Sequence, residues 1–355
     1  PALRRGLEAR QARRAPRLSR WDGWVGPLAG EAHVLDRVQS ATGLQWWATC
    51  PRRFFFERLL DIAETPTPED ELQLPPMEAG TLVHLALERF LADTPPRTSP
   101  HQPWSRAERE LLAAILDDVF AEAERRGITG RPLLWHIQRR RLTRDVLAFL
   151  DRDEQARARD GVVPVAGEMG FGLFDSEQPP VEVVTPTGRK VAFRGKVDRV
   201  DAAPDGSRLV VLDYKTGSHQ RYVGLGDDPV QAGRSLQLPL YAMAARARFG
   251  PVPTEAAYWF VSERADYRRF PVALDQGTNA RFLAVLDAIA DGIEAGVFPA
   301  NPGKEDGRRR HAHCAVCPYD SVCPRDRRQA WERVQDDPVL APYHRLAGEN
   351  GEGSP

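Results

Sequence analysis

The spacing of apolar residues divides this 355-residue chain into a helical first half and a mixed second half. Apolar residues recur at helical intervals in residues 80–91, 106–126 and 132–158, which predicts three amphipathic helices. The aromatic-rich residues 40–60 are also predicted to be helical, whereas residues 61–78 are acidic and Pro-rich and are expected to form a loop. We therefore expect a helical insertion, at about residues 92–160, ahead of a sheet.

From residue 162 onward the pattern becomes that of strands. Residues 162–174 and 191–200 are strand candidates, and residues 208–217 begin with four consecutive apolar positions, as in a buried strand. A helix, a strand and a second helix are then expected at 235–249, 256–261 and 278–296. This order predicts an α/β domain with a small mixed sheet flanked by helices.

Two of the predicted strands are separated by Asp205-Gly206, a pair that favours a tight hairpin turn. A two-residue loop at this pair places Asp198 directly opposite Asp213, where like charges are destabilising. Asp213 and Lys215 lie on one face of the strand because side chains alternate. A divalent cation between the carboxylates would remove the conflict, and a structural ion pair between Asp213 and Lys215 is the alternative.

Composition narrows the function classes. With 49 Lys and Arg residues against 50 Asp and Glu residues, the chain has no overall positive field, so any nucleic-acid binding must be local. Only four basic residues are Lys, and Arg suits bidentate phosphate contacts. No apolar run approaches the roughly 18 to 20 residues of a membrane span and no signal sequence is present, so we expect a cytoplasmic protein. No GxxxxGK[ST] phosphate loop occurs, so any ATP-driven motor would lie elsewhere.

The four cysteines form two groups. Cys50 stands alone, and Cys314, Cys317 and Cys323 follow with C-x2-C-x5-C spacing. Cytoplasmic proteins rarely keep disulfides, so a metal centre shared by both groups is expected. Zinc, with His311 and His313 as further ligands, and an iron–sulfur cluster are the two candidates.

Three strings together resemble the RecB-family branch of PD-(D/E)XK nucleases, namely GKVDRVD at 195–201, LDYKTG at 212–217 and QLPLY at 237–241. The resemblance implies a restriction-endonuclease-like core over residues 40–330. The flanking residues are expected to form a basic N-terminal arm (1–39) and a C-terminal tail (331–355). It also implies a DNA nuclease that depends on Mg²⁺ or Mn²⁺. Asp198 and Asp213 would be metal ligands, and Lys215 would position or activate the attacking water.

The same resemblance implies accessory site residues. His84, in GTLVH, matches an additional metal ligand, the Tyr214 carbonyl is a further ligand, and Glu168 matches the acid of the first core strand. Gln237 and Tyr241 lie four residues apart, so they share a helix face that could contact the active site or DNA. Taken alone, a histidine such as His84 among apolar neighbours is more often a core residue, packing explains Tyr241 about as well as a site role does, and Glu168 could be a solvent-facing strand acid.

The cysteine pattern, with Pro after three of the four residues, closely resembles the [4Fe-4S] staple of AddB-type nuclease domains, which implies an iron–sulfur segment at 311–324. The expected function is the nuclease part of an AddB-like helicase–nuclease in double-strand-break repair. It would act on single-stranded DNA or DNA ends, with a helicase region or subunit as partner. The alternatives are a stand-alone RecB-like exonuclease related to CRISPR adaptation nucleases, and a non-catalytic DNA-end-binding module.

The first residues of the chain form the basic arm. Residues 1–20 contain seven Arg and are expected to be a solvated helix or linker, with DNA contact as the minority alternative. Trp21 to Trp24 are expected to dock this arm on the body.

Overall fold

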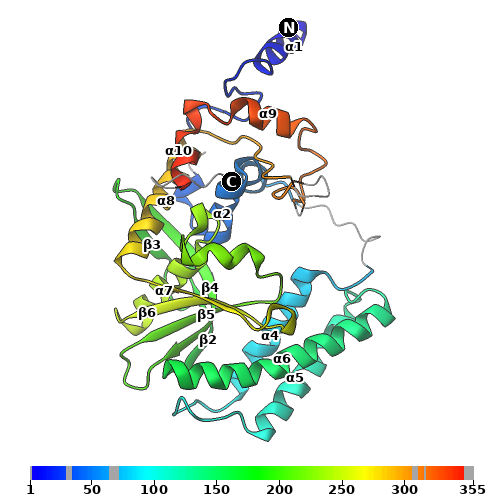
Figure 1. The fold of residues 1–355 in the computed structure, drawn as a ribbon, viewed down its shortest axis with the longest axis vertical. Coiled ribbons are helices and arrows are strands. Elements are labelled where there is room, and N and C mark those ends of the chain that lie inside the picture. Colours follow the sequence, from blue (N-terminus) through cyan, green and yellow to red (C-terminus); the bar gives the residue numbers. More distant parts are fainter. Residues whose placement is uncertain (1, 29–33, 64–71, 306–310, 316, 348–355) are drawn as a thin grey trace.

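The computed structural model describes residues 2–28, 34–63, 72–305, 311–315 and 317–347. These parts form a seven-stranded mixed sheet between two helical layers (Figure 1). The predicted α/β class with a mixed, helix-flanked sheet is therefore confirmed. Of the predicted loop at 61–78, the segment 64–71 lies outside the described residues, as do residue 316 of the predicted iron–sulfur segment and residues 348–355 of the predicted tail.

The sheet is organised around one long strand that pairs with four others. The strands are β1 (Gln39–Ser40), β2 (Val163–Phe171), β3 (Val181–Val184), β4 (Lys190–Ala202), β5 (Leu209–Lys215), β6 (Thr254–Phe260) and β7 (Arg269–Ala273). The central strand is β4, which is antiparallel to β2, β3 and β5 and parallel to β1. On the other side of β5 lies the parallel strand β6, and β7 pairs antiparallel with β6 at the edge of the sheet.

One face of the sheet carries the predicted helical insertion. Helices α4 (Pro76–Asp93), α5 (Arg106–Arg125) and α6 (Pro132–Asp160) pack together against alternate residues of β5 and β6, with α5 and α6 running side by side in Figure 1. A capping box between Ser105 and Glu108 begins α5. Gly161, in the left-handed conformation, ends α6. The three predicted helices are thus observed, with ends shifted by a few residues.

The other face is covered by helices from distant parts of the chain, α2 (Ala41–Thr49), α7 (Gln237–Phe249) and α8 (Gln276–Glu294). Helices α2 and α8 meet closely because Gly292 has no side chain to displace the ring of Trp47, which is completely buried. The Trp47 indole donates a hydrogen bond to the Val297 carbonyl at 3.0 Å. Cys50 is the C-cap residue that directly follows α2, so this contact helps to fix the position of the isolated cysteine.

The helix predicted at residues 40–60 is observed as α2 followed by two shorter elements, and other short helices lie in the loops. After α2 the chain forms α3 and then a π-helical turn, η3. The short elements are η2 (Val34–Asp36), α3 (Pro51–Phe54), η3 (Phe55–Leu59), η5 (Gln220–Gly226), η6 (Gln231–Gly233) and η7 (Glu263–Ala265).

The two terminal segments meet beside α8 (Figure 1). Helix α1 (Ala2–Ala12) buries no residue, as expected for a solvated arm. Trp24 pairs with Val297 and its indole donates to the Ala295 carbonyl at 3.1 Å, which confirms that the tryptophan segment docks on the body.

The C-terminal elements also pack on the body, burying Val334, Leu340 and Leu346, so residues 334–346 of the predicted tail are part of the folded domain. These elements are α9 (Arg327–Val334), η8 (Pro338–Leu340), α10 (Ala341–His344) and η9 (Arg345–Ala347). Within the described ranges, no helix combines the length and apolarity needed to cross a membrane.

Candidate active site and cysteine-lined cavity

The hairpin β4–β5 has the predicted register but a different loop. Arg199 pairs with Leu212 and Ala202 with Leu209, as the prediction requires. The two-residue loop is wrong, because the Ala203 amide bonds to the Arg208 carbonyl at 3.0 Å and the Gly206 amide to the Ala203 carbonyl at 2.8 Å. Pro204 has no amide hydrogen to pair across the strands, so the loop widens to four residues without shifting the register.

Arg199 pairs with Leu212 at the open end of the hairpin, so the next two residues outward, Asp198 and Asp213, lie opposite each other on the same face. Both are buried. The Tyr214 amide donates to Asp198 Oδ2 at 2.6 Å, which holds one carboxylate against the neighbouring strand.

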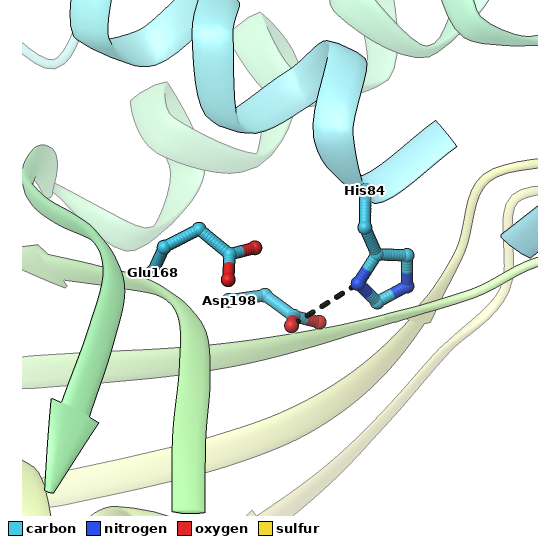
Figure 2. Close-up of side chains that lie close together, drawn as sticks. All are labelled: His84, Glu168 and Asp198. Carbon is cyan, nitrogen blue, oxygen red and sulfur yellow. Dashed lines mark hydrogen bonds and ion pairs between the residues drawn. The ribbon is translucent and has the colours of Figure 1, made fainter. Parts of the chain in front are cut away.

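His84, Glu168 and Asp198 form the one place in the described residues where three potential metal-ligand side chains offer donor atoms within 4.8 Å of one another. They come from α4, β2 and β4, and Figure 2 shows the imidazole and the Glu168 carboxylate on either side of Asp198. His84 Nδ1 lies 3.1 Å from Asp198 Oδ1, and His84 Nε2 lies 3.0 Å from the Tyr214 carbonyl oxygen. Of the groups predicted to hold the metal, His84, Asp198 and the Tyr214 carbonyl lie together, whereas Asp213 is not among the three clustered side chains and contacts Lys215 instead.

Both ring nitrogens of His84 therefore face oxygen atoms. Burial disfavours the charged ring, but the hydrogen bond and charge of Asp198 outweigh it and raise the pKa of His84. A neutral imidazole can donate to only one of the two oxygens. A cation in place of the second proton would satisfy the remaining nitrogen and oxygen together.

Lys215 contacts the carboxylate of Asp213. Burial raises the pKa of Asp213, as does the nearby charge of Asp198, and Lys215 opposes both. Burial would lower the pKa of Lys215, but Asp213 outweighs it, so the pKa is raised and the amine stays charged at neutral pH. A charged Lys215 can donate hydrogen bonds but cannot accept a proton, which bears on the predicted choice between positioning and activating water.

Glu168 lies opposite Asp198 in an unusual backbone conformation. Its φ is +48° within β2, a region that costs a non-glycine residue free energy and that is enriched at functional sites. Lys196 binds the Glu168 carboxylate at 2.7 Å. Burial raises the pKa of Glu168, and Lys196 opposes this shift. The acid is therefore held in the site and is not a freely solvated strand residue.

Gln237 and Tyr241 lie at the edge of the site rather than among the metal-ligand group. The Gln237 amide donates to the Tyr241 hydroxyl at 3.2 Å and accepts from the Tyr258 hydroxyl at 3.4 Å. Lys215 Nζ lies 4.9 Å from the centre of the Tyr258 ring. The pair is thus connected to Lys215 through Tyr258.

Comparison with known proteins now adds the family. The sequence profile of the PD-(D/E)XK nuclease superfamily matches residues 39–324, most of the chain. The chain belongs to this superfamily.

Curated relatives agree with the assignment. A protein of Moorella thermoacetica, named as a subunit of an ATP-dependent helicase/deoxyribonuclease, is 29% identical over 253 residues, covering 68% of this chain and 21% of the relative. A protein of the same name from Symbiobacterium thermophilum is 30% identical over 254 residues, covering 67% of this chain and 21% of the relative. Another from Acetivibrio thermocellus is 28% identical over 199 residues, covering 54% of this chain and 16% of the relative. The chain thus spans about a fifth of the length of these relatives. The predicted resemblance to RecB-family nucleases is confirmed.

The PD-(D/E)XK domain also carries a second candidate site, a cavity lined by its four cysteines, Cys50, Cys314, Cys317 and Cys323. His313 lines it too, with Nδ1 3.2 Å from the Asn301 carbonyl. Burial raises the pKa of the Cys50 thiol to about 11, although backbone hydrogen bonds from Arg53 and Asn301 oppose the shift. Without a metal, the thiol is therefore protonated at neutral pH.

No three of the four sulfur atoms, all of them in described residues, have the mutual spacing of a tetrahedral zinc site. Zinc–sulfur bonds of about 2.3 Å in a tetrahedron bring sulfurs to about 3.8 Å from one another. Within the described residues, the group around His84 is the only one with three donor atoms inside 4.8 Å, so no three thiols have the zinc spacing.

Sequence reasoning missed two residues of this PD-(D/E)XK site. Lys196 is one of only four lysines and lies two residues before Asp198, so its rarity and strand spacing were available signals. Tyr258 pairs with Asp213 across parallel strands β5 and β6, a register that no local pattern predicts.

Proposed function

We propose that this PD-(D/E)XK domain is a metal-dependent deoxyribonuclease that hydrolyses phosphodiester bonds in DNA. The observation that carries the proposal is the convergence of His84, Asp198 and the Tyr214 carbonyl at the open end of one hairpin, with Asp213 and Lys215 paired on strand β5 next to them. The names of the relatives support DNA as the substrate.

The donor set fits a hard divalent cation. One imidazole, two carboxylates and a peptide carbonyl suit Mg²⁺ or Mn²⁺ better than a thiophilic metal. His84, Asp198, Asp213 and the Tyr214 carbonyl would hold the ion, which supplies charge neutralisation at phosphorus and a more acidic water.

The other residues of the chain have distinct roles in this proposal. Lys215 stays protonated beside Asp213 and donates hydrogen bonds to a phosphate oxygen or to the attacking water. Glu168, held by Lys196, orients water on the side of Asp198 away from His84. Gln237 and Tyr241 support Lys215 through Tyr258 and limit the space beside it.

The test compares cleavage of labelled single-stranded DNA in Mg²⁺ by the wild type and by Asp213→Ala and Lys215→Ala. Each substitution should reduce the rate by about 10² to 10³ or more, because it removes charge stabilisation at the reacting phosphate. Lys190→Ala is the matched control, since Lys190 is an exposed β4 lysine paired with Glu182. Folded wild type that binds DNA ends as well as Asp213→Ala does, but cuts no DNA with Mg²⁺ or Mn²⁺, would replace this proposal with a DNA-end-binding module.

We further propose that the four cysteines bind a [4Fe-4S] cluster. Support comes from the shared cavity and from the sequence spacing of Cys50 and the C-x2-C-x5-C segment. The protein purified without oxygen should be brown, with broad absorption near about 400 nm that oxidation bleaches. Elemental analysis that returned one zinc and no iron would contradict the cluster.

The relatives' names and lengths support a place for this domain within a larger helicase–nuclease that processes DNA ends in double-strand-break repair. A helicase region or subunit would then supply single-stranded DNA, and the reducing cytoplasm would keep the thiols available for iron. The genomic reading frame upstream of Pro1 tests this point. A frame that continues into a helicase-like region supports it, and a frame that starts at this domain favours a stand-alone exonuclease.

A further inference from the structure

A second lysine lies at the edge of the metal site. Lys196 precedes Asp198 by two residues on β4, so the two side chains lie on the same face of the strand. Its Nζ atom lies 2.7 Å from Glu168 Oε2 on β2 and 3.6 Å from Glu88 Oε1 on α4. One ammonium group is therefore held between carboxylates from two different elements.

The helix α4 connects this lysine to the metal-ligand group. Glu88 follows His84 by four residues, so the two side chains lie on the same face of the helix. His84 contacts Asp198, and Glu88 pairs with Lys196 one helical turn further along. Glu168 has contacts in both directions, because its carboxylate belongs to the group with His84 and Asp198 and also binds Lys196. The acidic residues thus extend past the metal-ligand group, and the ammonium group lies among those at the far end.

The charges of these residues match one divalent cation. Glu88, Glu168 and Asp198 supply three negative charges, and Lys196 supplies one positive charge. A histidine that binds a metal is neutral, and the Asp–Lys pair on β5 cancels within itself. Two negative charges remain, which one Mg²⁺ or Mn²⁺ ion balances. A second ion between Glu88 and Glu168 would have to displace the ammonium group that is already paired with them.

We propose that Lys196 takes the place of a second metal ion in this nuclease. In two-metal nucleases the ions lie about 3.5 to 4 Å apart, and together they stabilise the attacking and leaving oxygens of the phosphodiester. An ammonium group has three N–H donors, and Glu88 and Glu168 face two of them. The Lys196 side chain is 46% exposed, so the third donor is accessible to a phosphate oxygen of bound DNA. The inference rests on the proposed function, because it concerns the same reaction and the same metal site.

The experiment counts the Mn²⁺ ions that the anaerobically purified, DNA-free chain binds in a calorimetric titration. The wild type should bind one ion. Lys196→Met keeps a side chain of similar length but removes the ammonium group, so the released carboxylates should bind a second, weaker ion and the stoichiometry should rise from one to two. The first binding step should stay within a few-fold of the wild type, because solvent screens the charge of a half-exposed side chain.

Two further variants locate the additional ion. Lys190→Met is the matched control, because Lys190 is also an exposed lysine of β4 but pairs with a single carboxylate, that of Glu182, at 3.1 Å. This control should leave the stoichiometry at one. The double variant Lys196→Met/Glu88→Gln removes one of the released carboxylates and should return the stoichiometry from two to one.

The outcomes separate this inference from the proposed function. Wild type that binds two Mn²⁺ ions and cuts DNA overturns the role of Lys196 and leaves the nuclease intact, without any variant being needed. A folded Lys196→Met protein that binds one ion also overturns this role, as does an additional ion that persists in the double variant. Wild type that neither binds Mn²⁺ nor cuts DNA overturns both the role of Lys196 and the proposed function.

Discussion

The contact between Gly292 and Trp47 permits a quantitative test of the packing that holds α2 on α8. A Cβ atom built on Gly292 would lie 2.0 and 2.3 Å from two carbons of the Trp47 ring. Non-bonded carbons ordinarily lie about 3.5 to 4.0 Å apart, so Gly292→Ala requires a ring displacement of about 1.5 Å. Trp47 is completely buried, and its indole is hydrogen-bonded to Val297, so the ring cannot move without cost.

The expected loss follows from three contributions. Overpacking a core costs about 1 to 3 kcal/mol, and weakening the indole hydrogen bond costs about 1 kcal/mol. The greater helix propensity of Ala returns about 1 kcal/mol. Gly292→Ala should therefore lower the free energy of unfolding by about 1 to 3 kcal/mol, measured as a lower urea midpoint. It should also lower the iron content, because α2 ends at Cys50.

Gly277→Ala is the matched control on the same helix, since the nearest atom to its added Cβ is a side-chain oxygen at 3.5 Å. It should leave the midpoint unchanged or raise it. Trp47→Phe removes the two ring carbons that clash, so the double variant Gly292→Ala/Trp47→Phe should be more stable than the sum of the single effects requires. Equal midpoints for Gly292→Ala and Gly277→Ala, or strict additivity with Trp47→Phe, would refute this account.

Three further outcomes are expected. Cys50→Ser should abolish the absorption near about 400 nm and lower the thermal unfolding midpoint, because the remaining thiols lie in a segment far along the chain. An unchanged midpoint would argue against a structural role for the cluster. Mn²⁺ affinity, measured by calorimetric titration, should fall as the pH drops from 8 to 6. Asp198 raises the pKa of His84 against the effect of burial, so the ring becomes protonated in this range and competes with the cation. The variant His84→Gln should move this pH dependence to lower pH. Lys196→Ala should slow cleavage about tenfold while leaving Mn²⁺ affinity near the wild-type value, because Lys196 holds Glu168 rather than the metal. Equal cleavage rates for this variant and the wild type would remove Glu168 from the mechanism.

The hairpin was predictable because its signals are local. Alternating side chains and a turn-forming pair gave the correct register, although the effect of Pro204 on the loop was overlooked. Strands β1, β3 and β7 were missed because two to five residues, mostly at edges, carry too little periodicity.

The hairpin pattern predicted Asp198 and Asp213, but the accessory residues of the site were predictable only through the family resemblance. His84 and Glu168 come from separate elements, and no spacing rule connects either of them to Asp198. The buried ion pair between Arg199 and Asp153 was missed for a different reason. A charged residue in a sequence is ordinarily expected at the surface, and only the tertiary structure shows that Asp153 has an arginine partner inside the domain.

The cysteine-lined cavity constrains the order in which this protein matures. Cys50 leaves the ribosome 264 residues before Cys314, which corresponds to roughly 15 to 50 seconds at about 5 to 20 residues per second. During that interval the first thiol has no partners, while the helices and the sheet between the two cysteine segments are already being made. The cavity can therefore be completed only late in synthesis, and a chain that stops before Cys323 lacks part of its wall however well the hairpin has folded. In such incomplete chains Cys50 would lack the wall that the later cysteines supply, so only a finished molecule has the complete cavity.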